Sequence, residues 1–282
     1  MPTLRALIIC SSFICFWPKN GIAETSEIII FADFACTENT VGDPDDCLAV
    51  EALSRRKSVK ILAIVATGGN ANENLSFKLG QTLFPDLLVL QGSRAGVRSK
   101  GVLETNRKLH EIIRSNVNGV IILALSPATD FAMLVNHQRS VLDNVKAVVF
   151  VAGRSPGDEF QVRDNGRKIR DMNYEKDRGS FGTILLALHD HRIKTTFVGF
   201  RASMNARLPA EFVSRHFKQR ARQSWRRKTI FWFGGELPLF DAVAALTVTR
   251  WHNSLNCRPV NVRAGKHLEL RSSPRSNFSF CE

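Results

Sequence analysis

Short, continuously apolar runs alternate with longer amphipathic stretches along the first half of the chain. Runs rich in β-branched residues predict strands, and stretches with apolar positions every three or four residues predict helices. The expected strands are 28–31, 61–65, 87–90, 120–125 and 145–151, and the expected helices are 47–53, 74–83, 104–115 and 128–135. Because strands without polar alternation are buried on both faces, this order predicts an α/β fold with an open, mostly parallel sheet flanked by helices.

Polar residues follow the predicted strands directly. Asp33 follows the first strand, Asn70 comes shortly after the second, residues 126–130 follow a later strand and Gly153 follows the next. Open parallel sheets bind ligands at the carboxyl ends of their strands, so these positions are candidate site residues. The polar stretch from Gly153 to about residue 168 predicts a long surface loop.

The N-terminus has the pattern of an export signal. Arg5 precedes an apolar run over 6–17, and Gly21-Ile22-Ala23 offers small residues for cleavage, so residues 1–23 are expected to be a signal peptide. An uncleaved membrane anchor is the alternative, but the run is shorter than the ~20 residues that span a bilayer. We therefore expect an exported protein, periplasmic or secreted, without stable membrane insertion.

The mature part, 24–282, is expected to form a single domain with a C-terminal tail from about residue 251. Four of the six cysteines remain in it, and they are Cys36, Cys47, Cys257 and Cys281. In an oxidising compartment they can pair. Cys257 with Cys281 would hold the tail, and Cys36 with Cys47 would close the loop after the first strand, but the sequence leaves the pairing open.

The formal net charge of +13 raises the question of nucleic-acid binding, because the basic residues are densest over 215–228. A solvated helix face is the alternative explanation, and it is favoured because no recognisable nucleic-acid module accompanies the charge. We therefore expect no specific nucleic-acid partner. A protein that binds anionic surfaces through this basic stretch remains a separate hypothesis.

Four aspartates crowd the loop after the first predicted strand, and they are Asp33, Asp43, Asp45 and Asp46. Asp45 or Asp46 as an N-cap of the following helix would account for one carboxylate. Several carboxylates together repel one another unless a cation neutralises them. Calcium is the expected cation because it takes six to eight oxygen ligands in irregular geometry.

The segments 28–33 and 42–49 resemble the aspartate-rich opening of the inosine-uridine preferring nucleoside hydrolase family. Asp33 matches the second aspartate of the family motif, and Asp45 and Asp46 match its terminal pair. Phe31 stands in place of the first aspartate, and the intervening loop is longer than in the family.

Four later segments follow the order of the family as far as about Arg250. They are Gly69-Asn70, Leu125-Ser126-Pro127-Ala128-Thr129-Asp130, Asp171-Met172-Asn173-Tyr174-Glu175-Lys176-Asp177 and Leu239-Phe240-Asp241-Ala242-Val243-Ala244. Taken singly, Asn70 could be a turn residue, and Asp171 and Asp241 could cap helices. Together they resemble a divergent N-ribohydrolase with the Rossmann-like fold of that family.

The resemblance implies calcium-dependent hydrolysis of the N-glycosidic bond of a ribonucleoside to free base and ribose. The implied calcium ligands are Asp33, Asp46, Asp241 and the backbone carbonyl of Leu125. The implied ribose ligands are Asp45, Asn70, Asp171 and Asn173. Asp33 would be the general base, with Asn70 and Phe240 also in the catalytic group.

Phe240 stands where inosine- and uridine-preferring members carry a histidine that can protonate the leaving base, and a phenyl ring cannot donate a proton. Purine-specific relatives carry an aromatic residue there, and the aromatic segment 231–233 could complete a stacking wall. Stacking therefore predicts a purine preference. The competing hypothesis is a relative that binds nucleoside and metal without turnover. A homo-oligomer is compatible with the sequence, which does not determine the oligomeric state.

Overall fold

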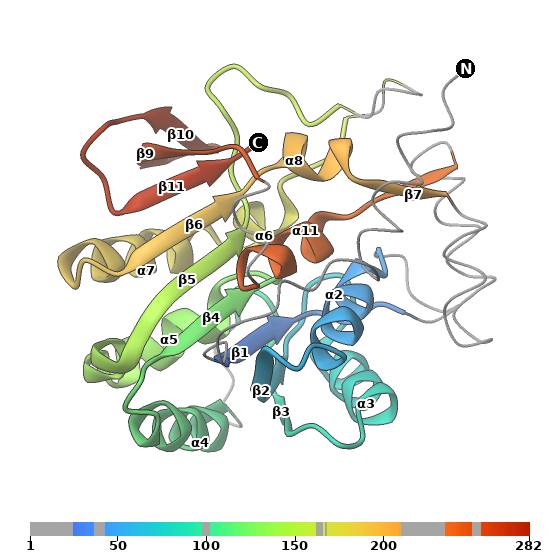
Figure 1. The fold of residues 1–282 in the computed structure, drawn as a ribbon, viewed down its shortest axis with the longest axis vertical. Helices are drawn as coiled ribbons and strands as arrows, with labels where there is room; N and C mark the ends of the chain where they lie inside the picture. The colour runs from blue at the N-terminus through green and yellow to red at the C-terminus, as the bar shows by residue number, and fades with distance from the viewer. Residues whose placement is uncertain are drawn as a thin grey trace, which may run out of the picture.

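The computed structural model describes residues 25–36, 43–97, 102–161, 166, 168–209, 235–249 and 255–282. Within them, nine strands form one sheet in the order β10-β9-β11-β6-β5-β4-β1-β2-β3 (Figure 1). From β3 to β11 neighbouring strands are parallel, and β9 is antiparallel to both β10 and β11. The strands are β1 (Ser26–Ala32), β2 (Val59–Ala66), β3 (Val89–Gln91), β4 (Val120–Ala124), β5 (Val145–Val151), β6 (Lys194–Val198), β9 (Cys257–Ala264), β10 (Leu268–Ser272) and β11 (Phe278–Cys281).

The first strand, β1, lies in the interior of the sheet between β2 and β4. The chain leaves β1 toward β2 and β3 on one side and returns through β4 and β5 on the other, so the strand order reverses beside β1. Ligands of open α/β sheets bind outside the carboxyl ends of the strands at such a reversal. Asp33, directly after β1, therefore stands at the position where this topology favours a site.

Helices cover both faces of the sheet (Figure 1). The helices are α2 (Asp45–Ser54), α3 (Glu73–Leu83), α4 (Val102–Ser115), α5 (Thr129–His137), the 3-10 helix η1 (Arg139–Asn144), α6 (Met172–Glu175), α7 (Arg178–Asp190), α8 (Phe200–Asn205) and α11 (Phe240–Thr247). Apolar residues of α4, α5 and α7 pack on one face, and those of α2, α8 and α11 pack on the other. A two-stranded ribbon of β7 (Arg207–Pro209) and β8 (Glu236–Pro238) lies outside the main sheet.

Alternate side chains of β1 contribute to two different cores. Ile29 and Phe31 pack into the cluster with α4, α5 and α7, whereas Ile28 and Ile30 pack into the cluster with α2 and α11. All four side chains are buried. A strand that is covered on both sides needs apolar residues at every position, which explains the continuous apolar run.

The predicted strands and helices of the first half are all present, with ends that differ by a few residues. The fold class predicted from the sequence is confirmed. In the part of the loop after Gly153 that the structure describes, residues 152–161 form no helix or strand beyond isolated bridges. Helix α7 and strand β6 were not predicted.

The C-terminal segment, expected as a tail from about residue 251, contains three strands. Residues 257–281 form β9, β10 and β11, and β11 pairs in parallel with β6 along residues 278–281. Disulfides join Cys257 to Cys281 and Cys36 to Cys47. The segment belongs to the sheet because β6 offers an unpaired edge, and edge strands recruit further strands.

Several expectations lie outside the described residues. They are the signal peptide 1–23, the basic stretch 215–228 and the aromatic segment 231–233. Among the helices that the structure describes, none combines the length and apolarity that a bilayer span requires.

Candidate metal centre

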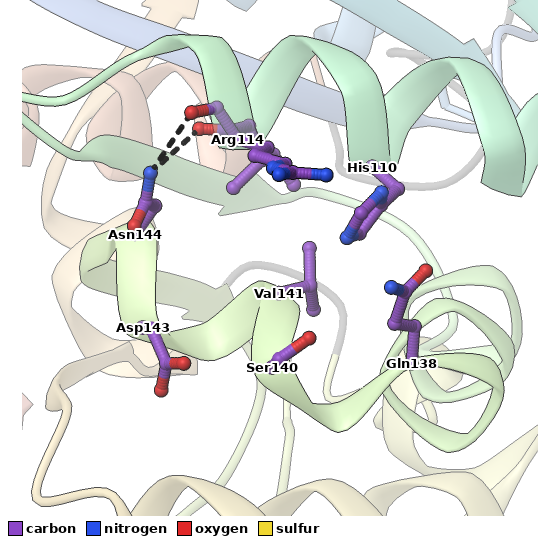
Figure 2. Close-up of a pocket in the computed structure, with 8 residues that line it drawn as sticks. His110, Arg114, Gln138, Ser140, Val141, Asp143 and Asn144 are labelled. Carbon is purple, nitrogen blue, oxygen red and sulfur yellow. Dashed lines mark hydrogen bonds between the residues drawn. The ribbon is translucent and has the colours of Figure 1, made fainter.

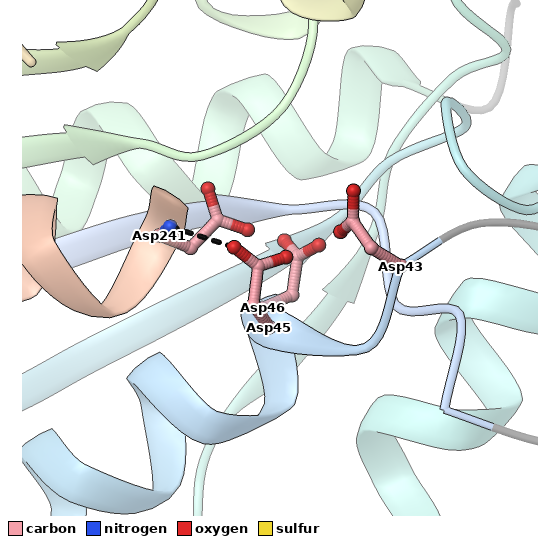
Figure 3. Close-up of side chains that lie close together, drawn as sticks. All are labelled: Asp43, Asp45, Asp46 and Asp241. Atoms are coloured by element: carbon pink, nitrogen blue, oxygen red, sulfur yellow. Dashed lines mark hydrogen bonds between the residues drawn. The ribbon is translucent and has the colours of Figure 1, made fainter. Parts of the chain in front are cut away.

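Four carboxylates converge at the carboxyl edge of the sheet. Asp43 and the first two residues of α2, Asp45 and Asp46, meet Asp241 from the first turn of α11 (Figure 3). One oxygen from each of the four lies within 4.8 Å of the others. Three of these side chains are buried, and Asp43 is partly exposed. Close packing of α2 against α11 brings together residues that are far apart in the sequence.

One oxygen of each α2 aspartate binds a backbone amide. The amide of Asp241 donates to Oδ2 of Asp45 at 2.8 Å, and the amide of Asp33 donates to Oδ1 of Asp46 at 3.0 Å. These bonds join α2 to α11 and to the end of β1. The two aspartates do not cap α2, because Pro44 holds the cap position and neither makes a side-chain cap bond. Asp241 likewise does not cap α11, which has Leu239 at its cap position.

The second oxygen of each α2 aspartate is left without a partner. Oδ1 of Asp45 and Oδ2 of Asp46 are buried and accept no hydrogen bond from any described residue. A buried, unsatisfied carboxylate oxygen is costly, and native structures rarely retain one without a ligand. Two such atoms in one group of four carboxylates fit a bound cation.

Burial raises the pKa of Asp46 to about 7, with the negative charge of Asp43 as the next cause. Burial also raises the pKa of Asp45 and of Asp241, and the neighbouring aspartates add to it. The group therefore holds its negative charges at a free-energy cost. A divalent cation offsets that cost, and an all-oxygen donor set suits a hard cation such as calcium or magnesium.

Asp33 lies at the margin of this group. Its carboxylate accepts hydrogen bonds from the backbone amide of Asn70 at 2.7 Å and from the Asn70 side-chain amide at 3.2 Å. The Asn70 side chain also donates to Asp43 at 3.4 Å. A Cβ at Gly69 would overlap Oδ2 of Asp33, so this turn requires glycine. Burial and the charge of Asp46 raise the pKa of Asp33.

The structure brings Leu125 and Asn173 together. The Asn173 side-chain amide donates to the carbonyl of Leu125 at 2.8 Å and to the carbonyl of Val151 at 3.0 Å. Leu125 itself donates its amide to Phe31 at the end of β1. Asn173 thus ties together the ends of β4 and β5. The Leu125 carbonyl directly follows β4, the strand next to β1, which leads to Asp33.

Asp171 is buried and its carboxylate is held by backbone amides. Gly153 donates to it at 2.8 Å and Tyr174 at 3.4 Å, so Asp171 caps the short helix α6. Burial raises its pKa to about 6. The N-cap alternative from the sequence is confirmed for this residue, and both carboxylate oxygens are already engaged.

Phe240 belongs to a row of stacked rings. It stacks on Phe200 with 6.0 Å between ring centroids, Phe200 stacks on Phe160 at 4.6 Å, and the guanidinium of Arg154 lies 4.2 Å from the Phe160 centroid. Phe240 is partly buried and immediately precedes Asp241. The row of rings therefore reaches the residue directly before Asp241.

Phe31 cannot take part in the site. It is fully buried, and its ring lies 5.7 Å from that of Phe131 on the opposite face of the sheet from α2. The position that carries the first aspartate of the family motif is therefore a core position in this chain.

Two contributors were missed from the sequence. Asp43 was seen in the aspartate loop but was not assigned as a ligand, because only the packing of α11 shows which carboxylates converge. Lys176 donates from Nζ to the carbonyl of Gly69 and holds the turn that contacts Asp33. The position of Lys176 three residues after Asn173 gave no signal for that contact.

A separate hollow of about 220 Å³ lies between α4 and η1 (Figure 2). It is lined by His110, Ile113, Arg114, Gln138, Ser140, Val141, Asp143 and Asn144. Asn144 directly precedes β5, so the hollow lies at the amino edge of the sheet, opposite the carboxylates. None of the site residues expected from the sequence lines it.

No family model and no curated protein matches the sequence. Solved structures do match the fold. The purine-preferring ribonucleoside hydrolase from Gardnerella vaginalis has a TM-score of 0.70 and 13% sequence identity, with 91% of this chain and 93% of that chain covered. The chain has the nucleoside hydrolase fold.

Two further solved structures match the fold of this chain. The inosine-uridine preferring nucleoside hydrolase from Bacillus anthracis has a TM-score of 0.64 and 11% identity over 91% of this chain and 94% of that chain. The type III effector protein XopQ, solved in complex with adenosine diphosphate ribose, has a TM-score of 0.68 and 13% identity, with 96% of this chain and 92% of that chain covered. The fold implied by the resemblance in the sequence is thus confirmed.

Proposed function

We propose that the protein is a divalent-cation-dependent N-ribohydrolase that cleaves ribonucleosides to free base and ribose. The observation that carries this proposal is the pair of buried, unpartnered oxygens of Asp45 and Asp46 at the carboxyl edge of a nucleoside hydrolase fold. Buried carboxylate oxygens without a hydrogen-bond partner are destabilising, and a ligand bound at this position would satisfy them. The export pattern of residues 1–23 further suggests that the protein acts outside the cytoplasm.

Calcium is the proposed cation. The converging side chains offer only carboxylate oxygens, and calcium accepts many such ligands without strict geometry. The proposed ligands are Asp33, Asp46, Asp241 and the Leu125 carbonyl, with Asp43 or Asp45 as additional ligands through their oxygens in the same group. When bound, the ion would supply positive charge that acidifies a water molecule and orients the ribose hydroxyls.

Asp33 is the proposed general base. Asn70 holds its carboxylate through two hydrogen bonds, which orients the oxygens without protonating them. Water adds to C1′ of the ribose while Asp33 takes its proton, and the C1′–N bond breaks with its electrons going to the base. The departing base then takes up one proton, so the products are ribose and neutral base.

Ribose binding is proposed for Asp45, Asn70, Asp171 and Asn173. Asn173 and Asp171 already bind backbone groups at the ends of β4 and β5. These two side chains would hold the strand ends in place. The ribose hydroxyls would hydrogen-bond to the polar atoms of the four side chains that remain without a protein partner. A purine base is proposed because Phe240, an aromatic residue that stacks on Phe200, directly precedes Asp241.

The decisive assay measures free ribose from inosine, guanosine, adenosine and uridine, with calcium and with a chelator. Calcium-dependent ribose release that is lost in Asp46→Ala supports the proposal. Arg139→Ala is the matched control, because its ion pair with Asp190 is exposed and lies at the ends of η1 and α7. Purified protein that binds calcium and releases no ribose from any of the four nucleosides contradicts it.

The second candidate function is nucleoside binding without turnover. Two observations favour it: Phe240 cannot protonate a leaving base, and both oxygens of Asp171 are already occupied by backbone amides. Calcium-dependent binding of an intact nucleoside by calorimetry, with no ribose after prolonged incubation, identifies this case.

A further inference from the structure

The Cys36–Cys47 disulfide joins the two segments that carry the candidate metal centre. Cys36 lies three residues after Asp33, and Cys47 directly follows Asp46. Both cysteines are buried in the apolar cluster beneath α2. The bond therefore links the chain that leaves β1 to the first turn of α2, on either side of the aspartate loop.

The polar contacts between these two segments are few. Among the described residues, the amide of Asp33 donates to Asp46, and Asn70 contacts both Asp33 and Asp43. The charged carboxylates repel one another, and Oδ1 of Asp45 and Oδ2 of Asp46 accept no hydrogen bond from a described residue. Like charges at this separation push the segments apart unless another constraint holds them.

We propose that the Cys36–Cys47 disulfide is a positioning element of the cation site, so that reduction of this one bond lowers cation affinity. The inference rests on the proposed function, because it concerns the same cation. It adds that the site binds the cation most tightly in an oxidising environment. The disulfide holds the end of β1 near the first turn of α2 before the cation binds. A preorganised site binds its ligand more tightly.

The reductive step is a thiol–disulfide exchange. A dithiol attacks one sulfur, and the S–S bond accepts two electrons and two protons to give two cysteine thiols, while the dithiol becomes a cyclic disulfide. Cys36 and Cys47 are then no longer joined, and repulsion between the carboxylates separates the end of β1 from the first turn of α2. A small dithiol or an oxidoreductase of the dithiol class would serve as the reductant in solution.

The experiment compares calcium titrations by calorimetry for three forms of the protein. They are the wild type, the double variant Cys36→Ala with Cys47→Ala, and the control double variant Cys257→Ala with Cys281→Ala. The control loses a disulfide of the same chemistry between β9 and β11, away from the carboxylates. Alanine keeps the cysteine positions apolar, and near-ultraviolet circular dichroism verifies that each variant is folded.

The expected result is a calcium affinity about 10- to 100-fold weaker in the Cys36/Cys47 variant, as is usual when a group that orients metal ligands is lost. The control variant keeps the wild-type affinity. Equal affinities in all three forms overturn the inference. If the Cys36/Cys47 variant does not fold, a second experiment uses the folded control variant, which keeps the Cys36–Cys47 disulfide. Dithiothreitol must then lower the calcium affinity of the control variant. An unchanged affinity again overturns the inference.

Calcium binding and ribose release separate this inference from the proposed function. Disulfide-dependent calcium binding without ribose release supports the inference and contradicts hydrolysis. Ribose release together with a calcium affinity that is the same with and without the Cys36–Cys47 disulfide supports hydrolysis and contradicts the inference.

Discussion

The carboxylate of Asp45 accepts a hydrogen bond from the backbone amide of Asp241 at 2.8 Å, although 196 residues separate the two in the chain. The bond joins the first turn of α2 to the first turn of α11. It uses one Asp45 oxygen and leaves the other buried and unpartnered beside Asp46. One side chain thus both holds two helices together and contributes to the candidate cation site.

Two substitutions separate these roles of Asp45. Asp45→Asn keeps an oxygen that can accept from Asp241, whereas Asp45→Ala leaves a buried amide unpaired, at a cost of about 1–3 kcal/mol. We expect both variants to lose calcium-dependent thermal stabilisation, and Asp45→Ala to have the lower free energy of unfolding by that amount. Urea denaturation measures the difference. Equal stabilities of the two variants would show that the hydrogen bond contributes nothing.

Gly69 is expected to tolerate no side chain. In Gly69→Ala the new Cβ overlaps Oδ2 of Asp33, so the turn and the carboxylate must separate. We expect a loss of about 1–3 kcal/mol in the free energy of unfolding, together with weaker calcium binding. Gly182→Ala is the control, because a Cβ there meets nothing within 4 Å, and alanine inside α7 should stabilise by up to ~1 kcal/mol. A Gly69→Ala protein as stable as Gly182→Ala contradicts the prediction.

Calcium affinity should rise with pH. Burial raises the pKa of Asp46 to about 7 from an ordinary value of 3.8, so the folded, metal-free protein holds that proton more tightly than the unfolded chain does. The stabilisation that comes from this tighter proton binding is fully present below the pKa of Asp46 in the unfolded chain. It is lost as the pH rises through the pKa of Asp46 in the folded protein. Calcium must displace the proton, so its affinity should increase across the same range.

Thermal unfolding between about pH 5 and pH 8, with and without calcium, measures both effects. Without calcium, Asp46→Asn should lose less stability than the wild type as pH rises, because the substituted side chain cannot titrate. A calcium affinity that does not change across this range is the contrary outcome.

Asn173 and Asn277 form a matched pair for testing strand-end geometry. Asn173 donates to the carbonyls of Leu125 and Val151 at the carboxyl edge, and Asn277 donates to those of Leu188 and Ile193 at the amino edge. Each alanine variant should lose about 1–3 kcal/mol of stability, since each leaves two carbonyls without that donor. Only Asn173→Ala should also reduce ribose release. A comparable reduction of ribose release in Asn277→Ala would show that the effect of Asn173→Ala comes from lower stability alone.

Phe240→His should restore a proton donor for the departing base. General acid catalysis contributes roughly 10²- to 10⁴-fold, so we expect kcat for inosine to rise by about 10²-fold, with a decline at alkaline pH as the imidazolium loses its proton. Phe240→Leu is the control, because it removes the ring without adding a donor. Equal rates and equal pH profiles for the two variants argue against proton donation to the departing base from this position.

The local pattern of the sequence determined the elements and the edge at which the site lies. Continuous apolar runs predict buried parallel strands because such strands are covered on both faces, and β1 bears this out with Ile29 and Ile30 packed into opposite cores. Asp33 and Asn70 were expected near one another because both follow neighbouring strands, and they are hydrogen-bonded.

Only the tertiary structure decided which side chains converge and which are already occupied. The docking of α11 against α2 brings Asp241 to Asp43, Asp45 and Asp46, and no local periodicity encodes a contact across so much chain. The amides of Gly153 and Tyr174 decide that Asp171 caps a helix. Likewise, β6 draws the C-terminal segment into the sheet, because pairing depends on which edge is open and not on propensity alone.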